Sequence, residues 1–340
     1  MNFFEELPKI ELHAHLNGSL SNRTLQELRK LKYGTNENGS PEDSGFYRID
    51  HGHSMDLRSC FQKFKYAHDL TDQPDLLAYA TQAVIEDFAN DQVIYLELRT
   101  SPKANQGMSK HDYLLTVLQT IRKVKDTIPS ITVKLLPSID RSKGIAEANE
   151  TIDLVLSLHQ TFSDIIVGVD LSGPPYGTKF SDFVPVLKRA KEKDLKMALH
   201  CGEFEDDGEV REMFEFGTDR IGHGTFIEGD TLKFAKEHRI PFECCLTSNV
   251  KCATVGSYRE HHFKKLWDAG HEVCICTDDF GVFDTTLSRE LAICSETFEL
   301  SQEEIFGLQV RAIEYAFASE NERSRLMNVL NRFKNDRMPC

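Results

Sequence analysis

Short runs of apolar and β-branched residues alternate with longer amphipathic segments along most of the chain. The apolar runs read KIELHAHL, VIYLELRT, TVKLLPSID, IIVGVDLSG, LKMALHCGE, DRIGHGT, IPFECCLTSN and HEVCICTDD. Such runs are typical of buried strands, whereas segments such as PDLLAYATQAVIEDFA and KHDYLLTVLQTIRKVKD place apolar residues three and four positions apart, as helices do. Eight strands that alternate with helices predict an α/β protein, a (β/α)8 TIM barrel.

Two further features bear on the domain organisation. After the eighth strand, TTLSRELAICSETF, SQEEIFGLQVRAIEYAFA and NERSRLMNVLNRF predict additional C-terminal helices. No linker separates a second domain, so we expect one barrel domain over residues 1–340. Residues 33–53 are rich in Gly, Ser, Asn and Pro and predict a mobile loop that acts as a lid. A doubly wound sheet is the competing fold, but no G-x-G-x-x-G or P-loop follows any strand.

Composition and charge narrow the class of protein. Hydrophobic residues make up 40% and charged residues 28%, as in ordinary soluble proteins. The net charge of -14 argues against binding of nucleic acid, which needs a basic surface. No apolar run approaches the length of a membrane span, and the N-terminus lacks the basic region of a signal peptide. We therefore expect a cytosolic protein without membrane contact, and a monomer.

The nine cysteines do not predict a structural metal site. Several lie inside apolar runs, as in FECCL and VCICT, and are typical of buried free thiols. Cys274 and Cys276 form C-x-C, and no paired C-x-x-C is present, so a zinc ribbon is disfavoured.

His13 and His15 lie two positions apart in IELHAHL. Because successive side chains of a strand point to opposite faces, both imidazoles face the same side and could bind one metal ion. The alternative is a pair of hydrogen-bonded polar residues at a strand end. The choice depends on partners elsewhere in the chain.

Polar residues close each of the eight apolar runs. In a TIM barrel the carboxyl ends of the strands carry the chemistry. The polar residues at these ends are His13 and His15, Arg99 to Lys103, Asp140, Ser172 and Gly173, His200 and Glu203, His223, Ser248 and Asn249, and Asp278 and Asp279. Eight polar strand ends in succession predict an active site at one end of the barrel.

Three histidines and one aspartate form the predicted metal site: His13, His15, His200 and Asp278. Imidazole and carboxylate ligands suit Zn²⁺, with a further position left for water. Taken singly, His200 is equally explained as a core histidine and Asp278 as a helix N-cap. The fourth run ends in VDLSG without a lysine that could bridge two ions, so we expect one zinc per chain.

Two further residues fit catalysis beside this metal. Bound zinc lowers the pKa of its water toward about 7 and so supplies hydroxide at neutral pH. Glu203, in HCGE, is placed to accept and donate a proton, although a surface glutamate is the alternative. His223 lies between two glycines in RIGHGT and could orient the hydroxide. Its alternative is a buried histidine bonded to a backbone carbonyl.

The motifs PKIELHAHLNGS, YLELRTSPK, VGVDLSG, LHCGE, RIGHG, CLTSN and CTDDFGVF span nearly the whole chain. Together and in this order they resemble the adenosine deaminase family of zinc-dependent aminohydrolases. The resemblance implies the same four zinc ligands, protonation of the purine N1 by Glu203 and activation of water by His223. It also implies that Asp279 holds the purine N7 and that the Gly173 backbone holds N3.

The resemblance adds His15, His68 and Asp140 as substrate contacts. His68, in KYAHDL, could equally face solvent from a helix. HLNGS, LELRTSPK and TDDFGVF are most similar to the adenosine deaminase-like branch of the family, whose substrate is a nucleotide, N6-methyl-AMP. This similarity implies hydrolysis of N6-substituted purine nucleoside monophosphates to IMP and the free amine.

Residue 17 separates the two branches. Members that act on nucleosides carry H-x-H-L-D-G, whereas this chain carries Asn17 in HAHLNG. An aspartate facing a phosphate would place like charges together, whereas asparagine can donate a hydrogen bond. Thr100, Ser101 and Lys103 add two hydroxyls and a cation, which suit a phosphate group.

Three other functions remain as alternatives. A deaminase of adenosine or adenine is disfavoured by Asn17 and by the segment RTSPK. A zinc-binding or purine-binding protein without turnover is disfavoured by the presence of Glu203 and His223. A hydrolase of a non-purine amide or ester is disfavoured by Asp279 and Gly173, which suit ring nitrogens.

Overall fold

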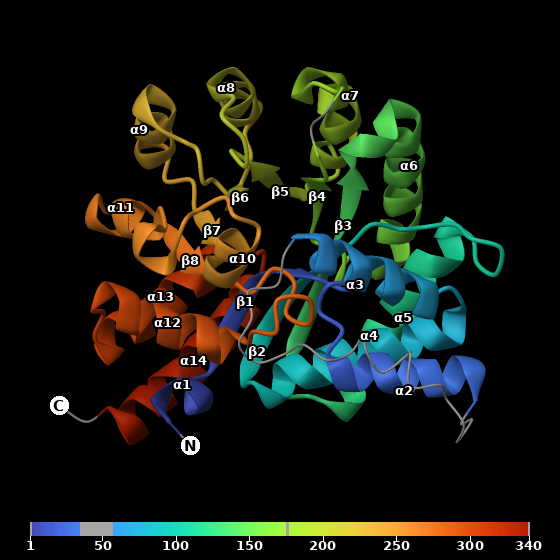
Figure 1. Cartoon of the computed structure of the whole chain (residues 1–340), viewed down its shortest axis with the longest axis horizontal. Helices are drawn as coiled ribbons and strands as arrows, with labels where there is room; N and C mark the ends of the chain where they lie inside the picture. The colour runs from blue at the N-terminus through green and yellow to red at the C-terminus, as the bar shows by residue number, and fades with distance from the viewer. Residues whose placement is uncertain (1, 35–56, 175–176, 339–340) are drawn as a thin grey trace.

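The computed structural model describes residues 2–34, 57–174 and 177–338 (Figure 1). Eight parallel strands pair in chain order. They are β1 (Lys9–His15), β2 (Val93–Thr100), β3 (Thr132–Asp140), β4 (Gly168–Ser172), β5 (Lys196–Cys201), β6 (Arg220–His223), β7 (Phe242–Cys244) and β8 (Val273–Ile275). The predicted (β/α)8 barrel is confirmed. The seventh run contains a shorter strand than expected, because LTSN begins a helix instead of extending β7.

Helices follow the strands and surround the barrel (Figure 1). They are α1 (Phe3–Glu6), α2 (Asn22–Tyr33), α3 (Leu57–Leu70), α4 (Pro74–Asn90), α5 (Lys110–Thr127), α6 (Gly144–Phe162), α7 (Phe180–Lys191), α8 (Asp207–Phe216), α9 (Gly229–Glu237), α10 (Leu246–Lys251), α11 (Phe263–Asp268), α12 (Leu287–Phe298), α13 (Gln302–Tyr315) and α14 (Glu320–Arg337), with the 3₁₀ turns η2 (Arg141–Lys143) and η3 (Tyr258–Glu260). Helices α12, α13 and α14 are the additional C-terminal helices expected from the sequence.

Hydrogen bonds between β1 and the segment after β8 close the barrel. The His15 N–H donates to the Asp278 carbonyl at 2.9 Å, and the Asp278 N–H donates to the His13 carbonyl at 2.8 Å. The Glu11 carboxylate crosses the same seam, because it accepts from the backbone N–H groups of His13 at 2.9 Å and Thr277 at 3.0 Å. Closure of the barrel therefore brings the two predicted ligands of β1 next to the predicted ligand after β8.

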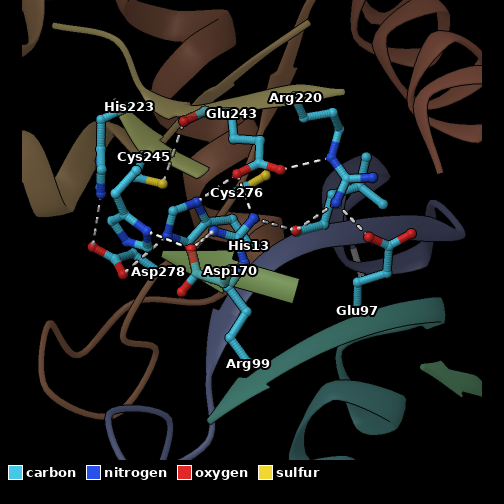
Figure 2. Close-up of polar contacts among 12 residues, drawn as sticks. His13, Glu97, Arg99, Asp170, Arg220, His223, Glu243, Cys245, Cys276 and Asp278 are labelled. Atoms are coloured by element: carbon cyan, nitrogen blue, oxygen red, sulfur yellow. Dashed lines mark hydrogen bonds and ion pairs between the residues drawn. The ribbon is translucent and has the colours of Figure 1, made fainter. Parts of the chain in front are cut away.

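The barrel interior contains buried charges among its apolar residues. Arg220 donates to Glu97 and, through Nε at 2.6 Å, to Glu243. Arg99 donates to the same Glu243 and to the Leu12 carbonyl at 3.2 Å. Each charged group therefore has a partner of opposite sign, which is what permits ions to be buried in a protein interior (Figure 2).

Several expectations concern the periphery. Only residues 33 and 34 of the predicted lid lie among the described residues, so the lid itself lies outside them.

Thr286, not Asp278, caps the N-terminus of α12, which removes the helix-cap explanation of Asp278. None of the helices in the described part of the chain is long and apolar enough to cross a membrane. The first and last helices lie near each other (Figure 1), and Arg337 Nη2 of α14 is 3.0 Å from Glu6 Oε2 of α1.

Candidate active site

The four predicted metal ligands converge at the carboxyl end of the barrel. Figure 2 shows two of them, His13 and Asp278. His15 Nε2 lies 3.3 Å from His200 Nε2 and 3.4 Å from Asp278 Oδ1. His13 Nε2 lies 3.5 Å from the same Asp278 oxygen. Zn–N bonds of about 2.0–2.1 Å at tetrahedral angles imply donor atoms about 3.4 Å apart, so these separations suit one zinc-sized ion.

The state of the histidine nitrogens also fits a metal. His13 Nε2 is buried and has no hydrogen-bond partner among the described residues, which is unusual for a polar atom. Its other nitrogen, Nδ1, lies 2.8 Å from Glu243 Oε2, and His200 Nδ1 lies 2.8 Å from Asp170 Oδ1. Each carboxylate accepts the Nδ1 proton and so leaves Nε2 as the nitrogen that can ligate a metal.

Glu243 and Asp170 are held as anions by the arginines of the barrel interior. Burial alone would raise the pKa of Glu243, but Arg99 and Arg220 keep it well below its usual range. Burial also opposes ionisation of Asp170, but His200 and Arg99 lower its pKa. The charged network in Figure 2 therefore extends from the interior to His13 through Glu243. Through Asp170 it extends to His200 as well.

The other ligands differ in protonation. Burial lowers the pKa of His15 to about 3, so this imidazole is neutral at pH 7. Burial also opposes protonation of His200, but Asp170 outweighs it and raises the pKa of His200 to about 9 in the metal-free protein. Asp278 remains ionised, because the neighbouring histidines keep its pKa well below the usual range despite burial. Its Oδ2 accepts a hydrogen bond from Ser248 Oγ at 2.6 Å.

Glu203 and His223 lie beside this cluster, as predicted. His223 Nε2 is 3.8 Å from Glu203 Oε1 and 3.9 Å from Asp278 Oδ2, a spacing that leaves room for a reacting oxygen among the three groups. Burial lowers the pKa of His223 to about 4, so the imidazole is neutral at pH 7. The backbone of His223 has φ of 63°, a conformation that is uncommon outside glycine and concentrated at functional sites.

Gly173 and Glu203 line one cavity together with His200. Gly173 has φ of +88°, and a Cβ atom there would lie 2.6 Å from Asp140 Oδ1, so only glycine fits. Asp140 itself caps η2 by accepting from the Ser142 N–H at 3.0 Å. The backbone at Gly173 is thus open to a ligand in the cavity.

Asp279 is buried beside the cluster. Burial and the negative charge of Asp278 raise the pKa of the Asp279 carboxyl well above its usual range, which favours the protonated form. A protonated carboxyl can donate to an unprotonated ring nitrogen such as the purine N7. A Cβ atom on Gly18 would lie 1.6 Å from Asp279 Oδ1, so the glycine of HLNG makes room for this carboxyl.

His68 and Lys103 are paired at the rim after β2. Lys103 Nζ lies 3.1 Å from His68 Nδ1, and both side chains are half-buried. Burial and the charge of Lys103 lower the pKa of His68 to about 3, so the imidazole is neutral. Burial lowers the pKa of Lys103 to about 8, although Asp140 acts in the opposite direction. His68 therefore contacts a second predicted substrate residue, and Ser101 lies half-buried between β2 and Lys103.

Asn17 and Thr100 belong to one chain of hydrogen bonds that runs through Tyr113. The Tyr113 hydroxyl donates to Asn17 Oδ1 at 2.9 Å and lies 2.7 Å from Thr100 Oγ1. Asn17 Nδ2 donates to Thr71 Oγ1 at 3.2 Å, and Thr71 donates onward to the Ala67 carbonyl at 2.8 Å. The Asn17 amide retains one hydrogen for a ligand, whereas the Thr100 hydrogen is used by Tyr113.

Sequence reasoning missed the residues that support the ligands. Glu243 and Asp170 orient two histidines, and Tyr113 connects Asn17 to Thr100. The first two were detectable in principle, because each is a charged residue inside an otherwise apolar strand, where burial is costly without a partner. Tyr113 lies on a helix and gave no such signal.

Comparisons with known protein families, sequences and structures agree with the geometry of this site. The profile of the family described as "Adenosine deaminase" matches residues 8–333. The chain therefore belongs to the adenosine deaminase family, and it is a hydrolase that acts on a carbon–nitrogen bond.

Individual relatives narrow the comparison. The chain is 46% identical over 329 residues to the "Adenosine deaminase-like protein" of Drosophila melanogaster, which covers 95% of each chain. It is 40% identical over 342 residues to the "N6-Methyl-AMP deaminase" of Homo sapiens, covering 98% of this chain and 95% of that protein. A crystal structure of arabidopsis ADAL complexed with IMP superposes with a TM-score of 0.87 at 38% identity and covers 99% of both chains.

Proposed function

We propose that this protein is a zinc-dependent deaminase of purine nucleoside monophosphates. Its substrates are N6-methyl-AMP and related N6-substituted nucleotides, and its products are IMP and the free amine. The relatives named as N6-methyl-AMP deaminase and the ADAL complex with IMP support a nucleotide substrate. The observation in this chain that carries the proposal is the half-buried cation Lys103, which follows the carboxyl end of β2 and is paired with neutral His68.

The phosphate proposal rests on the charges around Lys103. Lys103 supplies a positive charge, and the neutral His68 does not compete for it. Asn17 contributes an N–H group without adding a negative charge. Charge-assisted hydrogen bonds of this kind are about twice as strong as neutral ones. A nucleoside would lack the phosphate that could pair with this half-buried cation.

The cofactor proposal is one zinc ion held by His13, His15, His200 and Asp278. When bound, zinc lowers the pKa of a coordinated water to about 7 and supplies the nucleophile at neutral pH. The orphaned Nε2 of His13 and the carboxylates behind His13 and His200 support this assignment.

The chain's own residues then perform the remaining steps. Asp279 donates to the purine N7, and the Gly173 backbone contacts N3, so the ring is oriented with C6 toward the cluster. Glu203 takes the proton released by the attacking water and delivers it to N1 as the oxygen adds to C6. His223 stabilises the negative charge on the attacking oxygen. Glu203 then relays the proton of the C6 hydroxyl to N6, the C6–N6 bond breaks, and the free amine leaves as the C6=O group of IMP forms.

Four substrates test the proposal. Pure zinc-loaded protein is incubated with AMP, N6-methyl-AMP, adenosine and N6-methyladenosine, and the purine and amine products are identified. We expect IMP and methylamine from N6-methyl-AMP, with kcat/KM at least tenfold above that for either nucleoside. The Glu203→Gln variant serves as a control for contaminating deaminases. Faster turnover of adenosine would overturn the nucleotide assignment, and no turnover of any substrate would overturn the enzymatic one.

A further inference from the structure

A buried pair of polar side chains lies behind His223, on the side away from the metal cluster. Asn249, on α10, places its Nδ2 atom 3.4 Å from His223 Nδ1. His261, just before α11, places its Nε2 atom 3.0 Å from Asn249 Oδ1. Asn249 is 3% exposed and His261 is 2% exposed, so bulk water does not supply alternative partners.

The protonation of His261 is determined by the backbone. The Phe263 N–H donates to His261 Nδ1 at 3.0 Å, so Nδ1 carries no proton. The neutral ring must then carry its proton on Nε2, which donates to Asn249 Oδ1. This contact fixes which end of the Asn249 amide is oxygen and which is nitrogen.

Thr254 determines the orientation of the Asn249 side-chain amide independently of His261. Its hydroxyl donates to the Asn249 backbone carbonyl at 3.1 Å, which uses its only hydrogen. Thr254 Oγ1 can therefore only accept from Asn249 Nδ2, which lies 3.2 Å away. Two separate contacts thus turn the NH₂ group of Asn249 toward His223.

An amide nitrogen donates hydrogen bonds but does not accept them, so a proton on His223 Nδ1 would face the Asn249 NH₂ group. We propose that Asn249 and His261 are positioning residues that hold His223 in the neutral tautomer with its proton on Nε2. The tautomer assignment stands on these contacts alone, and only the expected effect on turnover rests on the proposed function. The Nε2–H group then points to the space between Glu203 and Asp278.

The tautomer decides what His223 does in the reaction. With Nε2–H facing the site, His223 is a hydrogen-bond donor to the attacking oxygen and does not act as the base that deprotonates it. That role falls to Glu203, whose Oε1 lies 3.8 Å from His223 Nε2. His262 also contacts this residue, because its Nε2–H donates to the His223 carbonyl at 2.9 Å.

The tautomer is measured directly by NMR of zinc-loaded protein labelled with ¹⁵N-histidine. Protonated and unprotonated imidazole nitrogens resonate far apart, and the His223 signals are assigned by their loss in His223→Gln. We expect the wild type to show a protonated Nε2 and an unprotonated Nδ1. A wild-type protein with the proton on Nδ1 overturns the proposal, whether or not the protein deaminates nucleotides.

Variants test the two positioning residues. In Asn249→Asp the group facing Nδ1 accepts instead of donating, so we expect a proton on Nδ1, a fall in kcat of about 100-fold and a KM within a few-fold of the wild type. His261→Leu should lose the preference for one tautomer, whereas His261→Gln, which keeps a donor toward Asn249, should retain it. Asn149→Asp, the same chemical change on α6 away from the site, should leave both the NMR pattern and kcat unchanged.

The outcomes separate the two proposals. An unchanged His223 pattern in both Asn249→Asp and His261→Leu overturns the positioning role, even if the enzyme is a nucleotide deaminase. A protein that shows the expected tautomer changes but releases no amine from any substrate supports the positioning role and overturns the proposed function. If Asn249→Asp fails to fold, the wild-type and His261 measurements still decide the question.

Discussion

Glu243 and His13 are joined by a hydrogen bond of 2.8 Å that links a metal ligand to the charged interior of the barrel. Arg99 and Arg220 donate to the same carboxylate. One carboxylate therefore orients a ligand and pairs with two buried cations, and its removal should affect both metal affinity and folding.

Glu243→Gln keeps the shape of the side chain but removes its charge. We expect the zinc affinity to fall about 10- to 100-fold, because partners of this kind orient the ligating histidine. The free energy of unfolding should fall by about 3–5 kcal/mol, because two buried arginines lose an anion. Competition with a zinc chelator and urea unfolding measure the two effects. Glu237→Gln, on the exposed face of α9, is the control, and an unchanged zinc affinity in Glu243→Gln would contradict the assignment.

Glu203→Gln should retain zinc and lose turnover. The amide fills the same space but does not transfer a proton, and proton-transfer groups contribute typically about 10²- to 10⁴-fold. Steady-state kinetics with N6-methyl-AMP and metal analysis of the same sample make the test. Glu215→Gln, at an exposed position on α8 outside the cavity lining, should behave as the wild type. A Glu203→Gln variant with near-normal kcat would assign proton transfer to another residue.

Zinc binding should release about one proton per chain near pH 7.5. The pKa of His200 is raised to about 9 in the metal-free protein, so the ring is protonated there and must lose its proton to bind zinc. The affinity for zinc should therefore rise about tenfold per pH unit up to about pH 9 and then level off. Calorimetry in buffers of different ionisation enthalpy counts the protons. Asp170→Asn removes the group that raises this pKa and should abolish most of the release.

The nucleotide preference should weaken at alkaline pH. Burial lowers the pKa of Lys103 to about 8, so the cation is present below this pH and is lost above it. The kcat/KM for N6-methyl-AMP should fall above about pH 8 relative to that for N6-methyladenosine, because the ratio cancels groups shared by both reactions. Lys103→Gln should remove this pH dependence of the ratio and lower kcat/KM for the nucleotide alone. A ratio that does not change between pH 7 and 10 would exclude Lys103 from phosphate binding.

Asn17→Asp should weaken nucleotide binding far more than nucleoside binding. A carboxylate would repel the phosphate, and its second oxygen would face Thr71 Oγ1, whose hydrogen is already used by the Ala67 carbonyl. We expect kcat/KM for N6-methyl-AMP to fall at least tenfold more than that for N6-methyladenosine. Equal losses for both substrates would show that the change acts through packing and not through charge.

Much of the fold and the metal cluster was predictable because barrel strands leave a strong pattern. All eight apolar runs contain a strand, and His13, His15, His200 and Asp278 meet as expected from their positions at strand ends. The position of Asn249 was not predictable in the same way, because apolar residues in IPFECCLTSN fit a strand or a buried helix equally well. Contacts that depend on tertiary packing, such as Tyr113 with Asn17, have no local signature in the sequence.

The seam between β1 and β8 also determines when the metal site can form during synthesis of the chain. His13 and His15 belong to the first strand of the barrel and Asp278 follows the last one, so a ribosome synthesises about four-fifths of the 340 residues before the third of these ligands exists. A nascent or truncated chain that lacks the region after β8 has no complete metal site, however well its earlier strands have folded. A metal held by all three residues would fasten the first strand to the last. Opening of the barrel at this seam would then require loss of the ion, so metal occupancy would report that the chain extends at least to Asp278 and that the barrel is closed.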